Sequence, residues 1–325
     1  MRVAVVGATG LVGGEMLRTL EELNFPVTEL IPVASARSVG NKVSFAGKEW
    51  SVVGMEEGIA AKPEIALFSA GGSTSKEWAP KFVAAGAIVI DNSSAWRMEA
   101  NIPLVVPEVN LDSIHGGRLI ANPNCSTIQM VTALAPIYRK YRIKRLVIST
   151  YQSVTGTGKA AVDQLFAERE GREYTPVYPT RIDLNCIPQC DVFTDNDYTK
   201  EEMKLVHETR KILGDPSIRI TATAVRVPVI GGHSEAVNVE TELPFDIADI
   251  KQAFSDAPGV ILLDDIANLS YPTPRIAHGK HEVFVGRVRR DESNDNTFNC
   301  WIVADNLRKG AATNAVQIAL GLIGR

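Results

Sequence analysis

Residues 2–13 read Arg-Val-Ala-Val-Val-Gly-Ala-Thr-Gly-Leu-Val-Gly. The β-branched run at 2–6 predicts a buried strand, and the apolar residues of 11–23 recur at helical spacing. Glycines spaced G-x-x-G-x-x-G lie between the two, where they let a ligand approach the backbone and the first N–H groups of the helix. A tight turn without a ligand is the alternative. The position between a strand and a helix favours a dinucleotide-binding domain.

The first 124 residues continue this alternation of strands and helices. Buried strands are predicted at residues 30–34, 65–69 and 88–91, and a helix at 74–85. This order is typical of a parallel sheet with helices on its faces. The fold class is therefore expected to be α/β, with a Rossmann-type domain at residues 1–124.

After residue 124 the strand-like runs become longer and alternate polar with apolar residues. They lie at 145–153, 218–228, 234–243, 283–289 and 298–304. Such runs predict an α+β domain with one large mixed sheet, and helices at 160–170, 200–213 and 246–256 are expected to cover one face of it. A last Ala-rich helix at 308–323 is expected to return to the first domain. The expected boundaries are thus 1–124, completed by 307–325, and 125–306.

The composition is that of an ordinary globular protein. The chain has 325 residues, of which 45% are hydrophobic, and a net charge of −4. This charge argues against a general binder of nucleic acid or anionic membranes. No run approaches the ~20 apolar residues of a membrane helix, and no signal peptide is evident, so a cytoplasmic location is expected. The four cysteines show neither a disulfide framework nor a metal-ligand spacing, and no metal site is expected.

The end of the second predicted strand bears on the choice of cofactor. An NAD site usually has a carboxylate here for the ribose hydroxyls, whereas residues 30–39 contain no Asp or Glu. Arg37, with Ser35 and Ser38, could instead bind the 2′-phosphate of NADP. The alternative is that Arg37 is a solvated loop charge. Small residues at 69–72, including Ser69 and Gly71, end the next parallel strand and could adjoin the pyrophosphate or ribose.

Cys125 follows the run Asn122-Pro123-Asn124, which breaks an apolar strand just before a helix-like stretch at 126–141. The partial positive charge of a helix N-terminus stabilises a thiolate and lowers a cysteine pKa. A buried packing residue is the alternative. A thiolate beside a nicotinamide cofactor indicates one reaction type, in which the thiol adds to an aldehyde, hydride leaves to NADP, and the thioester is cleaved.

Two residues of the second domain fit this chemistry. His233 lies in the glycine-flanked run 231–235 between two strand-like runs, where it could act as a general acid or base; a structural histidine is the alternative. Arg226 is a charge inside an apolar strand, and such an arginine usually has an anionic partner. Internal ion pairing and substrate binding remain equally open for it.

Seven motifs together resemble aspartate-β-semialdehyde dehydrogenases. They are Gly7 to Gly13, Asp91 to Arg97, Val106 to Asn110, Asn122 to Thr127, Tyr151 to Gly158, Asn185 to Gln189 and Gly232 to Glu235. They occur in order over nearly the whole chain. The resemblance implies reversible, NADP-dependent conversion of L-aspartate 4-semialdehyde and phosphate to 4-phospho-L-aspartate. This reaction runs reductively in the branch leading to lysine, threonine, methionine and isoleucine.

The resemblance also implies a role for each matching position. Cys125 would be the acyl-thioester nucleophile, His233 the acid/base, and Gln152 the residue that orients the substrate. Arg226 and Glu201 would hold the carboxylate and amino group of the substrate, while Arg97, Asn124 and Lys204 would bind phosphate. The implied cofactor contacts include Thr155, Gly156 and Asn306 near the nicotinamide, besides Gly7, Thr9, Gly10, Leu11, Val12, Ser35, Arg37, Ser38, Ser69 and Gly71. A catalytic and dimerisation domain is implied for 125–306, and hence a homodimer, with a homotetramer as the alternative.

Other functions compete with this reading. N-acetyl-γ-glutamyl-phosphate reductase shares the fold, the thiol and NADP, but has Cys-Tyr-Pro where this chain has Cys125-Ser126-Thr127. Glyceraldehyde-3-phosphate dehydrogenase is more distant, because its Ser-Cys-Thr-Thr run and its acidic NAD-selecting residue are missing. A non-catalytic dinucleotide-binding sensor would not need a thiol, an imidazole and anion-binding arginines together.

Overall fold

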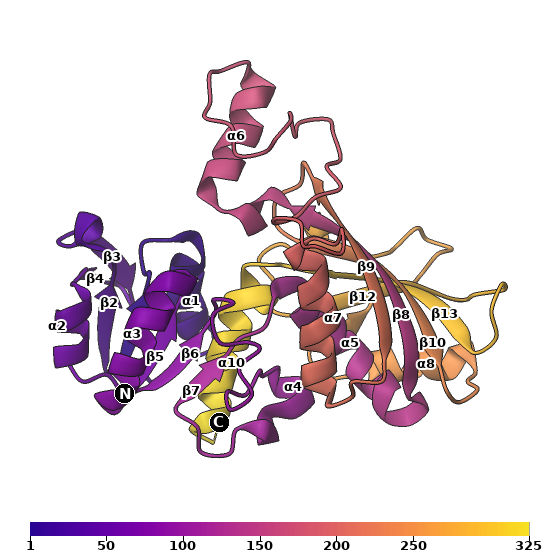
Figure 1. Cartoon of the computed structure of the whole chain (residues 1–325), viewed down its shortest axis with the longest axis horizontal. Coiled ribbons are helices and arrows are strands. Elements are labelled where there is room, and N and C mark those ends of the chain that lie inside the picture. The colour runs from indigo at the N-terminus through magenta and orange to yellow at the C-terminus, as the bar shows by residue number, and fades with distance from the viewer. Residues whose placement is uncertain (325) are drawn as a thin grey trace. The chain divides into compact units, whose positions relative to one another are not determined.

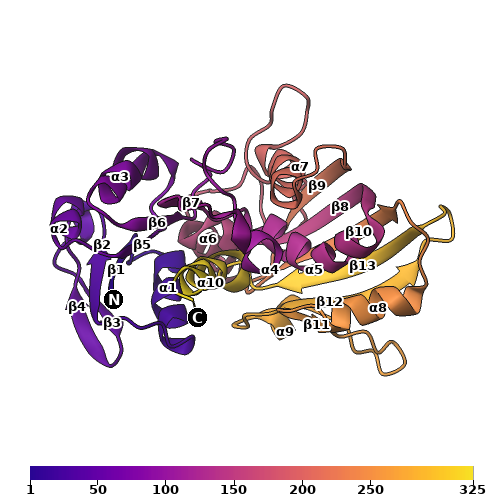
Figure 2. The ribbon, with the colours of Figure 1, turned by 90° about the horizontal axis from the view of Figure 1, so that it is seen from below.

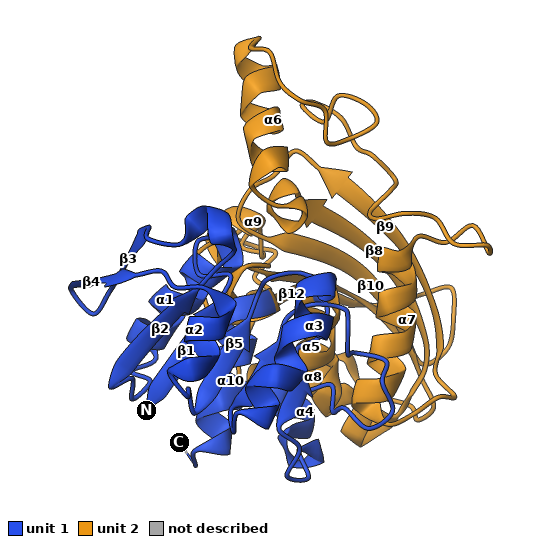
Figure 3. Cartoon of the chain, turned by 60° about the vertical axis from the view of Figure 1, so that its left-hand side comes forward, with its two compact units in different colours: residues 1–124, 311–325 blue, residues 125–310 orange. Residues whose placement is uncertain are grey.

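The computed structural model describes residues 1–324. The chain forms two compact units, the first from residues 1–124 and 311–325 and the second from residues 125–310 (Figure 3). The C-terminal return to the first unit begins at residue 311. Each unit has its own sheet.

The sheet of the first unit has five parallel strands in the order β2-β1-β5-β6-β7. These are β1 (Arg2–Val6), β2 (Glu29–Val33), β5 (Ile65–Phe68), β6 (Ile88–Asp91) and β7 (Leu119–Ala121). Apolar residues of α1 (Leu11–Glu22) and α10 (Thr313–Leu322) pack on one face, and those of α2 (Met55–Ala60) and α3 (Gly72–Ala84) on the other. Both faces are therefore covered, which explains why the strands are nearly continuous apolar runs.

Several short elements of the first unit were not predicted. They are the hairpin of β3 (Lys42–Phe45) and β4 (Lys48–Ser51), helices α2 and α4 (Pro107–Asn110), and the 3-10 turns η1 (Ala36–Ser38) and η2 (Leu111–Ser113). The hairpin strands are mostly exposed and rich in charge, so they lack the apolar pattern that marks a buried strand.

The sheet of the second unit is mixed, as predicted. Its order is β11-β12-β13-β10-β8-β9, and the strands follow one another across Figure 2. They are β8 (Ile143–Ser153), β9 (Arg219–Val227), β10 (His233–Thr241), β11 (Val260–Leu262), β12 (Val283–Arg290) and β13 (Thr297–Ala304). The pairs β8–β9 and β11–β12 are parallel, and the other three are antiparallel. The expected fold class is confirmed in both units.

Helices α5 (Cys125–Tyr141), α7 (Lys200–Leu213) and α8 (Ile247–Ser255) pack on one face of this sheet. The expectation that residues 160–170 also cover it was wrong. Helix α6 (Lys159–Glu170) packs instead on η3 (Val154–Thr157) and stands clear of the sheet (Figure 1). Its apolar side is buried in a separate small cluster with Val154, Ile182 and Ile187, and this local packing replaces burial on the sheet.

Two short helical elements complete the second unit, α9 (Pro274–Ala277) and the π-helical turn η4 (Arg308–Ala312), which leads into α10. Among the helices of residues 1–324, none is both long and apolar enough to cross a membrane.

Candidate active site

Cys125 is the first residue of α5. Pro123 keeps the preceding residue, Asn122, in an extended conformation, so the helix cannot begin before it. Beyond Cys125 the helix is almost wholly buried through its next ten residues, whereas Cys125 itself is partly exposed. The predicted helix N-terminus at this cysteine is therefore confirmed, with the helix beginning one residue earlier than the predicted Ser126. Such a position favours the thiolate.

Three of the expected catalytic and substrate residues lie side by side on adjacent strands. Gln152 of β8 is the direct partner of Arg226 on β9. On the other side of β8, the backbone N–H of Ser153 donates to Nδ1 of His233, the first residue of β10. Gln152, Arg226 and His233 are all buried. The sheet thus brings together three residues that lie far apart in the sequence.

The hydrogen bond of His233 fixes where its ring carries a proton. Burial lowers the pKa of His233 to about 3, and the nearby Arg226 guanidinium acts in the same direction, so the ring is neutral. Because Nδ1 accepts from Ser153 at 3.0 Å, the proton of the neutral ring is on Nε2. Within residues 1–324, this Nε2 has no hydrogen-bond partner. It is a buried donor available to a substrate.

Gly156 leaves the space in front of these groups open. A Cβ at this position would lie 3.0 Å from Nε2 of His233 and 3.0 Å from Nη1 of Arg226. Thr155 is held beside it by a 2.9 Å hydrogen bond to the Asn306 side chain. The structure therefore places the three residues expected near the nicotinamide, Thr155, Gly156 and Asn306, in the second unit, with Gly156 directly against the imidazole.

The Gln152 amide is connected to the helix that carries the cysteine. Its nitrogen lies 3.2 Å from Oγ of Ser126, the residue after Cys125, and 3.2 Å from both Thr150 Oγ1 and Glu201 Oε1. Two amide hydrogens thus face three acceptors, so one acceptor can be exchanged for a substrate atom without leaving the amide unsatisfied.

The contacts of Arg226 bear on its two interpretations. Its Nη1 donates to the Ser153 carbonyl oxygen at 2.7 Å. Residues 1–324 provide it with no ion-pair partner, and its Nε is a buried donor without an acceptor. An internal ion pair is therefore excluded within the described chain. A buried guanidinium with unused donors suits a carboxylate from outside the protein.

Helix α7 supplies a second set of charges next to this row. Thr199 and Glu202 form a capping box at its start. Lys204 lies 3.0 Å from Glu201 and 3.0 Å from Asp191, which confirms that positions 201 and 204 share a helical face. Burial acts to lower the pKa of Lys204, but these two carboxylates outweigh it and raise the pKa.

The glycine loop of the first unit fits a dinucleotide. The loop follows β1, which lies between β2 on one side and β5 on the other. The strand order therefore reverses its direction at β1, and in parallel sheets ligands bind at such a switch point. A Cβ on Gly7 would clash with the Ser69 carbonyl, and one on Gly13 with the Gly7 carbonyl. Gly10 is the N-cap of α1 and has no side chain to cap the first N–H groups. Those groups are suited to a pyrophosphate.

The other expected cofactor residues of this unit lie close by. Thr9 belongs to the loop, and Leu11 and Val12 begin α1. The Val33 carbonyl at the end of β2 accepts from the N–H groups of Gly7 and Ala8, so residues 35–38 follow directly beside the loop. Ser35 and Arg37 are exposed and Ser38 is half-buried. Gly71 has a φ of +82° at the start of α3, a conformation that favours glycine.

Arg97 and Asn124, expected to bind phosphate, belong to the first unit. Arg97 is buried, and its Nη2 donates to the Asn92 carbonyl oxygen at 2.7 Å. Asn124 is buried and precedes Cys125 directly in the chain.

Sequence reasoning gave no role to three residues around the site. Asp191 pairs with Lys204 from a loop whose sequence carries no signal. Gly310 lies so near the nucleophile that a Cβ there would be 2.8 Å from Cβ of Cys125. Glu235 is completely buried. For Glu235 a signal existed, because it has the same strand parity as the apolar residues Val237 and Val239, which face the helices.

Comparison with known proteins identifies the family. Residues 2–116 match the family described as semialdehyde dehydrogenase, NAD binding domain, and residues 134–309 match its dimerisation domain. The chain is 52% identical to aspartate-semialdehyde dehydrogenase of Aquifex aeolicus over 328 residues, covering 98% of this chain and 96% of that protein. The chain belongs to the aspartate-semialdehyde dehydrogenase family. It is accordingly an oxidoreductase with a dinucleotide-binding domain, as the motifs predicted.

Solved structures of aspartate-semialdehyde dehydrogenases share the whole fold. The Vibrio cholerae enzyme II, described as complexed with ASA, superposes with a TM-score of 0.95 at 49% identity, covering 99% of this chain and 98% of that one. The Candida albicans enzyme, described as with NADP, has a TM-score of 0.76 at 25% identity, covering 98% and 97%.

Proposed function

We propose that this protein catalyses the reversible, NADP-dependent reductive dephosphorylation of 4-phospho-L-aspartate to L-aspartate 4-semialdehyde through an acyl-thioester on Cys125. In the cytoplasm it would serve the biosynthesis of lysine, threonine, methionine and isoleucine. One observation carries the proposal. Next to the helix that begins with the thiol lie an imidazole with an unused Nε2–H and a buried guanidinium without an internal carboxylate.

In the phosphorylating direction, the Cys125 thiolate forms a bond to the aldehyde carbon, and the carbonyl oxygen becomes an alkoxide. The Nε2–H of His233 donates a hydrogen bond to this oxygen and stabilises the anionic thiohemiacetal. Loss of hydride from the carbon, which NADP would accept when bound, restores the carbonyl as a thioester. A phosphate oxygen then attacks the thioester carbon, and the Cys125 sulfur leaves as thiolate. The reverse sequence reduces 4-phospho-L-aspartate.

The charges of the side chains suggest which group of the substrate each would bind. Arg226 would bind the α-carboxylate through its unused donors, and Glu201 the α-ammonium group. Gln152 would orient the substrate beside the thiol. Arg97, Asn124 and Lys204 would bind phosphate, with Lys204 exchanging one of its two carboxylate partners for the anion.

The proposed domain roles assign NADP to residues 1–124 with 307–325, and catalysis and dimerisation to residues 125–306. The glycine loop would hold the pyrophosphate, and Arg37, Ser35 and Ser38 the 2′-phosphate. Ser69 and Gly71 would adjoin the ribose side, and Thr155, Gly156 and Asn306 the nicotinamide. When bound, NADP supplies the hydride acceptor for aldehyde oxidation and, as NADPH, the donor for the reverse.

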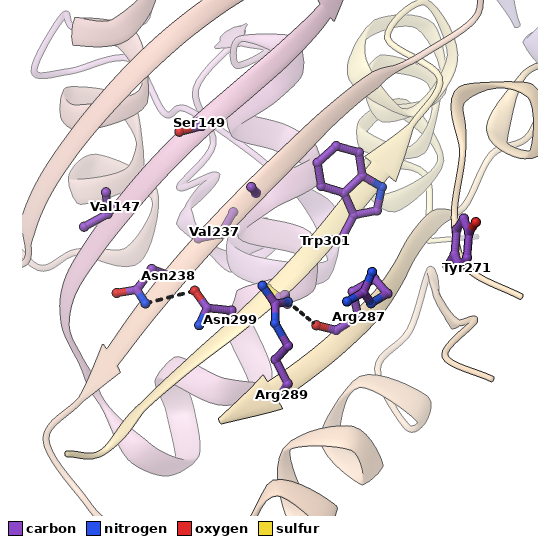
Figure 4. Close-up of a pocket in the computed structure, with 11 residues that line it drawn as sticks. Val147, Ser149, Val237, Asn238, Tyr271, Arg287, Arg289, Asn299 and Trp301 are labelled. Atoms are coloured by element: carbon purple, nitrogen blue, oxygen red, sulfur yellow. Dashed lines mark hydrogen bonds between the residues drawn. The ribbon is translucent and has the colours of Figure 1, made fainter. Parts of the chain in front are cut away.

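We place the contact of the proposed homodimer on the face of the large sheet that α5, α7 and α8 leave uncovered. Ser149, Ala236 and Trp301 are cross-strand neighbours there, and they line a pocket of about 480 Å³ with Asn238, Asn299 and Arg289 (Figure 4). Trp301 contacts the exposed Tyr151. The matched family description of residues 134–309 as a dimerisation domain supports dimerisation through this unit. A homotetramer would need a further surface.

One assay tests the activity. Formation of NADPH from L-aspartate 4-semialdehyde should require phosphate, and N-acetylglutamate semialdehyde should give little product under the same conditions. Activity with the second substrate alone would identify the chain as an N-acetyl-γ-glutamyl-phosphate reductase instead. Binding of NADP without turnover of either would favour the sensor.

A further inference from the structure

Glu235 is a completely buried carboxyl on the helix-facing side of β10. Its cross-strand partners are Thr150 on β8 and Ile302 on β13. No ion pair within residues 1–324 includes it. A buried carboxylate without a cation is costly, so this position is unusual for an acidic residue and requires an explanation.

The surroundings of Glu235 favour its protonated, neutral form. Burial raises its pKa well above the ordinary value, and the charge of Glu201 on α7 acts in the same direction. Gln129 and Ser126, from the first two turns of α5, lower the pKa, but they do not outweigh burial. The carboxyl group lies beside the Gln129 and Ser126 side chains, although neither of its oxygens meets strict hydrogen-bond geometry with a residue of the described chain. The buried thiol of Cys300 on β13 is a further titratable neighbour.

Gln129 and Ser126, the two neighbours of Glu235 on α5, each form a hydrogen bond with a proposed catalytic residue. The Gln129 side-chain nitrogen donates to the His233 backbone carbonyl at 3.3 Å. Its Oε1 is a buried acceptor with no donor among residues 1–324, and a neutral Glu235 brings an O–H donor next to it. Ser126 follows Cys125 in the chain and accepts from the Gln152 amide.

We propose that Glu235 is a positioning residue: as a neutral carboxylic acid it joins the first two turns of α5 to the sheet, and so fixes the Cys125 thiol beside Gln152. The inference rests on the proposed function, which makes Cys125 the nucleophile. Neutrality has a second consequence, because an ionised carboxylate behind the start of α5 would oppose the formation of the Cys125 thiolate.

Three variants test this proposal. Glu235→Gln keeps the size and the neutral state, Glu235→Leu removes the polar contacts, and Glu202→Gln is the matched control. Glu202 is a buried glutamate that accepts from the backbone N–H groups of Thr199 and Ala224, and it therefore needs its acceptor oxygens. The main readout is the pH dependence of iodoacetamide alkylation at Cys125, followed by peptide mass spectrometry. It needs no substrate, so it gives a result even if the proposed reaction is wrong.

We expect Glu235→Gln to alkylate with the same pH dependence as the parent and to keep kcat within about threefold. Glu235→Leu should lower kcat by about tenfold or more with a smaller change in KM, and should alter the alkylation profile. Two results would overturn the proposal. One is faster alkylation of Glu235→Gln at neutral pH, since the parent carboxyl would then be ionised; the other is a Glu235→Leu protein that matches the parent in kcat and alkylation.

The pH dependence of thermal unfolding gives an independent readout should Glu235→Leu fail to fold. A carboxyl whose pKa is raised in the folded protein contributes stability below its unfolded pKa of about 4.5 and loses it as the pH rises. The parent should therefore lose stability relative to Glu235→Gln from pH 4.5 upward. Glu202→Gln should instead be destabilised at neutral pH. A constant difference between the parent and Glu235→Gln across this range would contradict a neutral Glu235.

Discussion

The backbone N–H of Ser153 donates a hydrogen bond of 3.0 Å to Nδ1 of His233. This bond joins β8 to β10 next to Gln152, and it leaves the single proton of the neutral imidazole on Nε2. His233 therefore enters the reaction as a hydrogen-bond donor to the substrate oxygen.

The lowered pKa of His233 predicts a pH dependence of stability. The folded ring titrates near pH 3 and the unfolded ring near 6.5, so its contribution is present above pH 6.5 and is lost as the pH falls toward 3. The loss should reach on the order of a few kcal/mol. In thermal unfolding between pH 7 and 4, His233→Asn should show a shallower decline than the parent. Variant His207→Asn, at an exposed position, should follow the parent; equal slopes for all three would contradict the prediction.

Replacing Cys125 by Ala should reduce turnover by about 10⁴-fold or more, because no other residue can form the thioester. NADP binding, measured by fluorescence titration, should be unchanged. Cys186→Ala is the control, since Cys186 is an exposed free thiol. Substantial activity in Cys125→Ala would refute the covalent mechanism.

Arg226→Lys should raise KM for aspartate semialdehyde by about tenfold or more, because an ammonium group cannot reproduce the forked hydrogen bonds of a guanidinium to a carboxylate. Arg219→Lys on the same strand is the control, because Arg219 is exposed and its ion pair with Glu240 is long, at 3.5 Å. Steady-state kinetics should show a raised KM for Arg226→Lys and an unchanged KM for Arg219→Lys. A similar KM for both would remove Arg226 from the substrate site.

Arg37→Ala should weaken the binding of NADPH far more than the binding of NADH, since only NADPH carries the 2′-phosphate. Dissociation constants for the two cofactors measure this, and NADH serves as the internal control. An equal loss for both would mean that Arg37 is a solvated loop charge.

Gly310→Ala should lower kcat, because the added Cβ would approach Cβ of Cys125 to 2.8 Å and displace the start of α5. A loss of about tenfold or more is expected, since small displacements of a nucleophile are costly. Gly14→Ala in α1 is the control, because a Cβ there meets nothing within 4 Å. Its kcat should stay at the parent value. If Gly310→Ala behaves in the same way, the close packing at Cys125 has no effect on catalysis.

The sequence predicted most regular elements because their patterns are local. Strand β6 and helix α7 were placed at their observed bounds, as both have clear periodicity and, for α7, a capping box. The hairpin of β3 and β4 was missed because exposed strands carry little apolar signal. For α6 the predicted helix was correct, but its predicted packing on the sheet was wrong. Periodicity shows that a helix has an apolar side, but it does not show which element that side packs against.

By itself, the sequence determined the strand, glycine loop and helix that make a dinucleotide site, and the helix N-terminus at Cys125, because each depends on neighbours within about a dozen residues. Only the tertiary structure decided that Gln152, Arg226 and His233 form one row, that Arg226 has no internal carboxylate within the described chain, and that Glu235 lies buried behind the nucleophile. These facts depend on the register between strands and on the helices that cover them. Such long-range pairing is set by the packing of the whole unit.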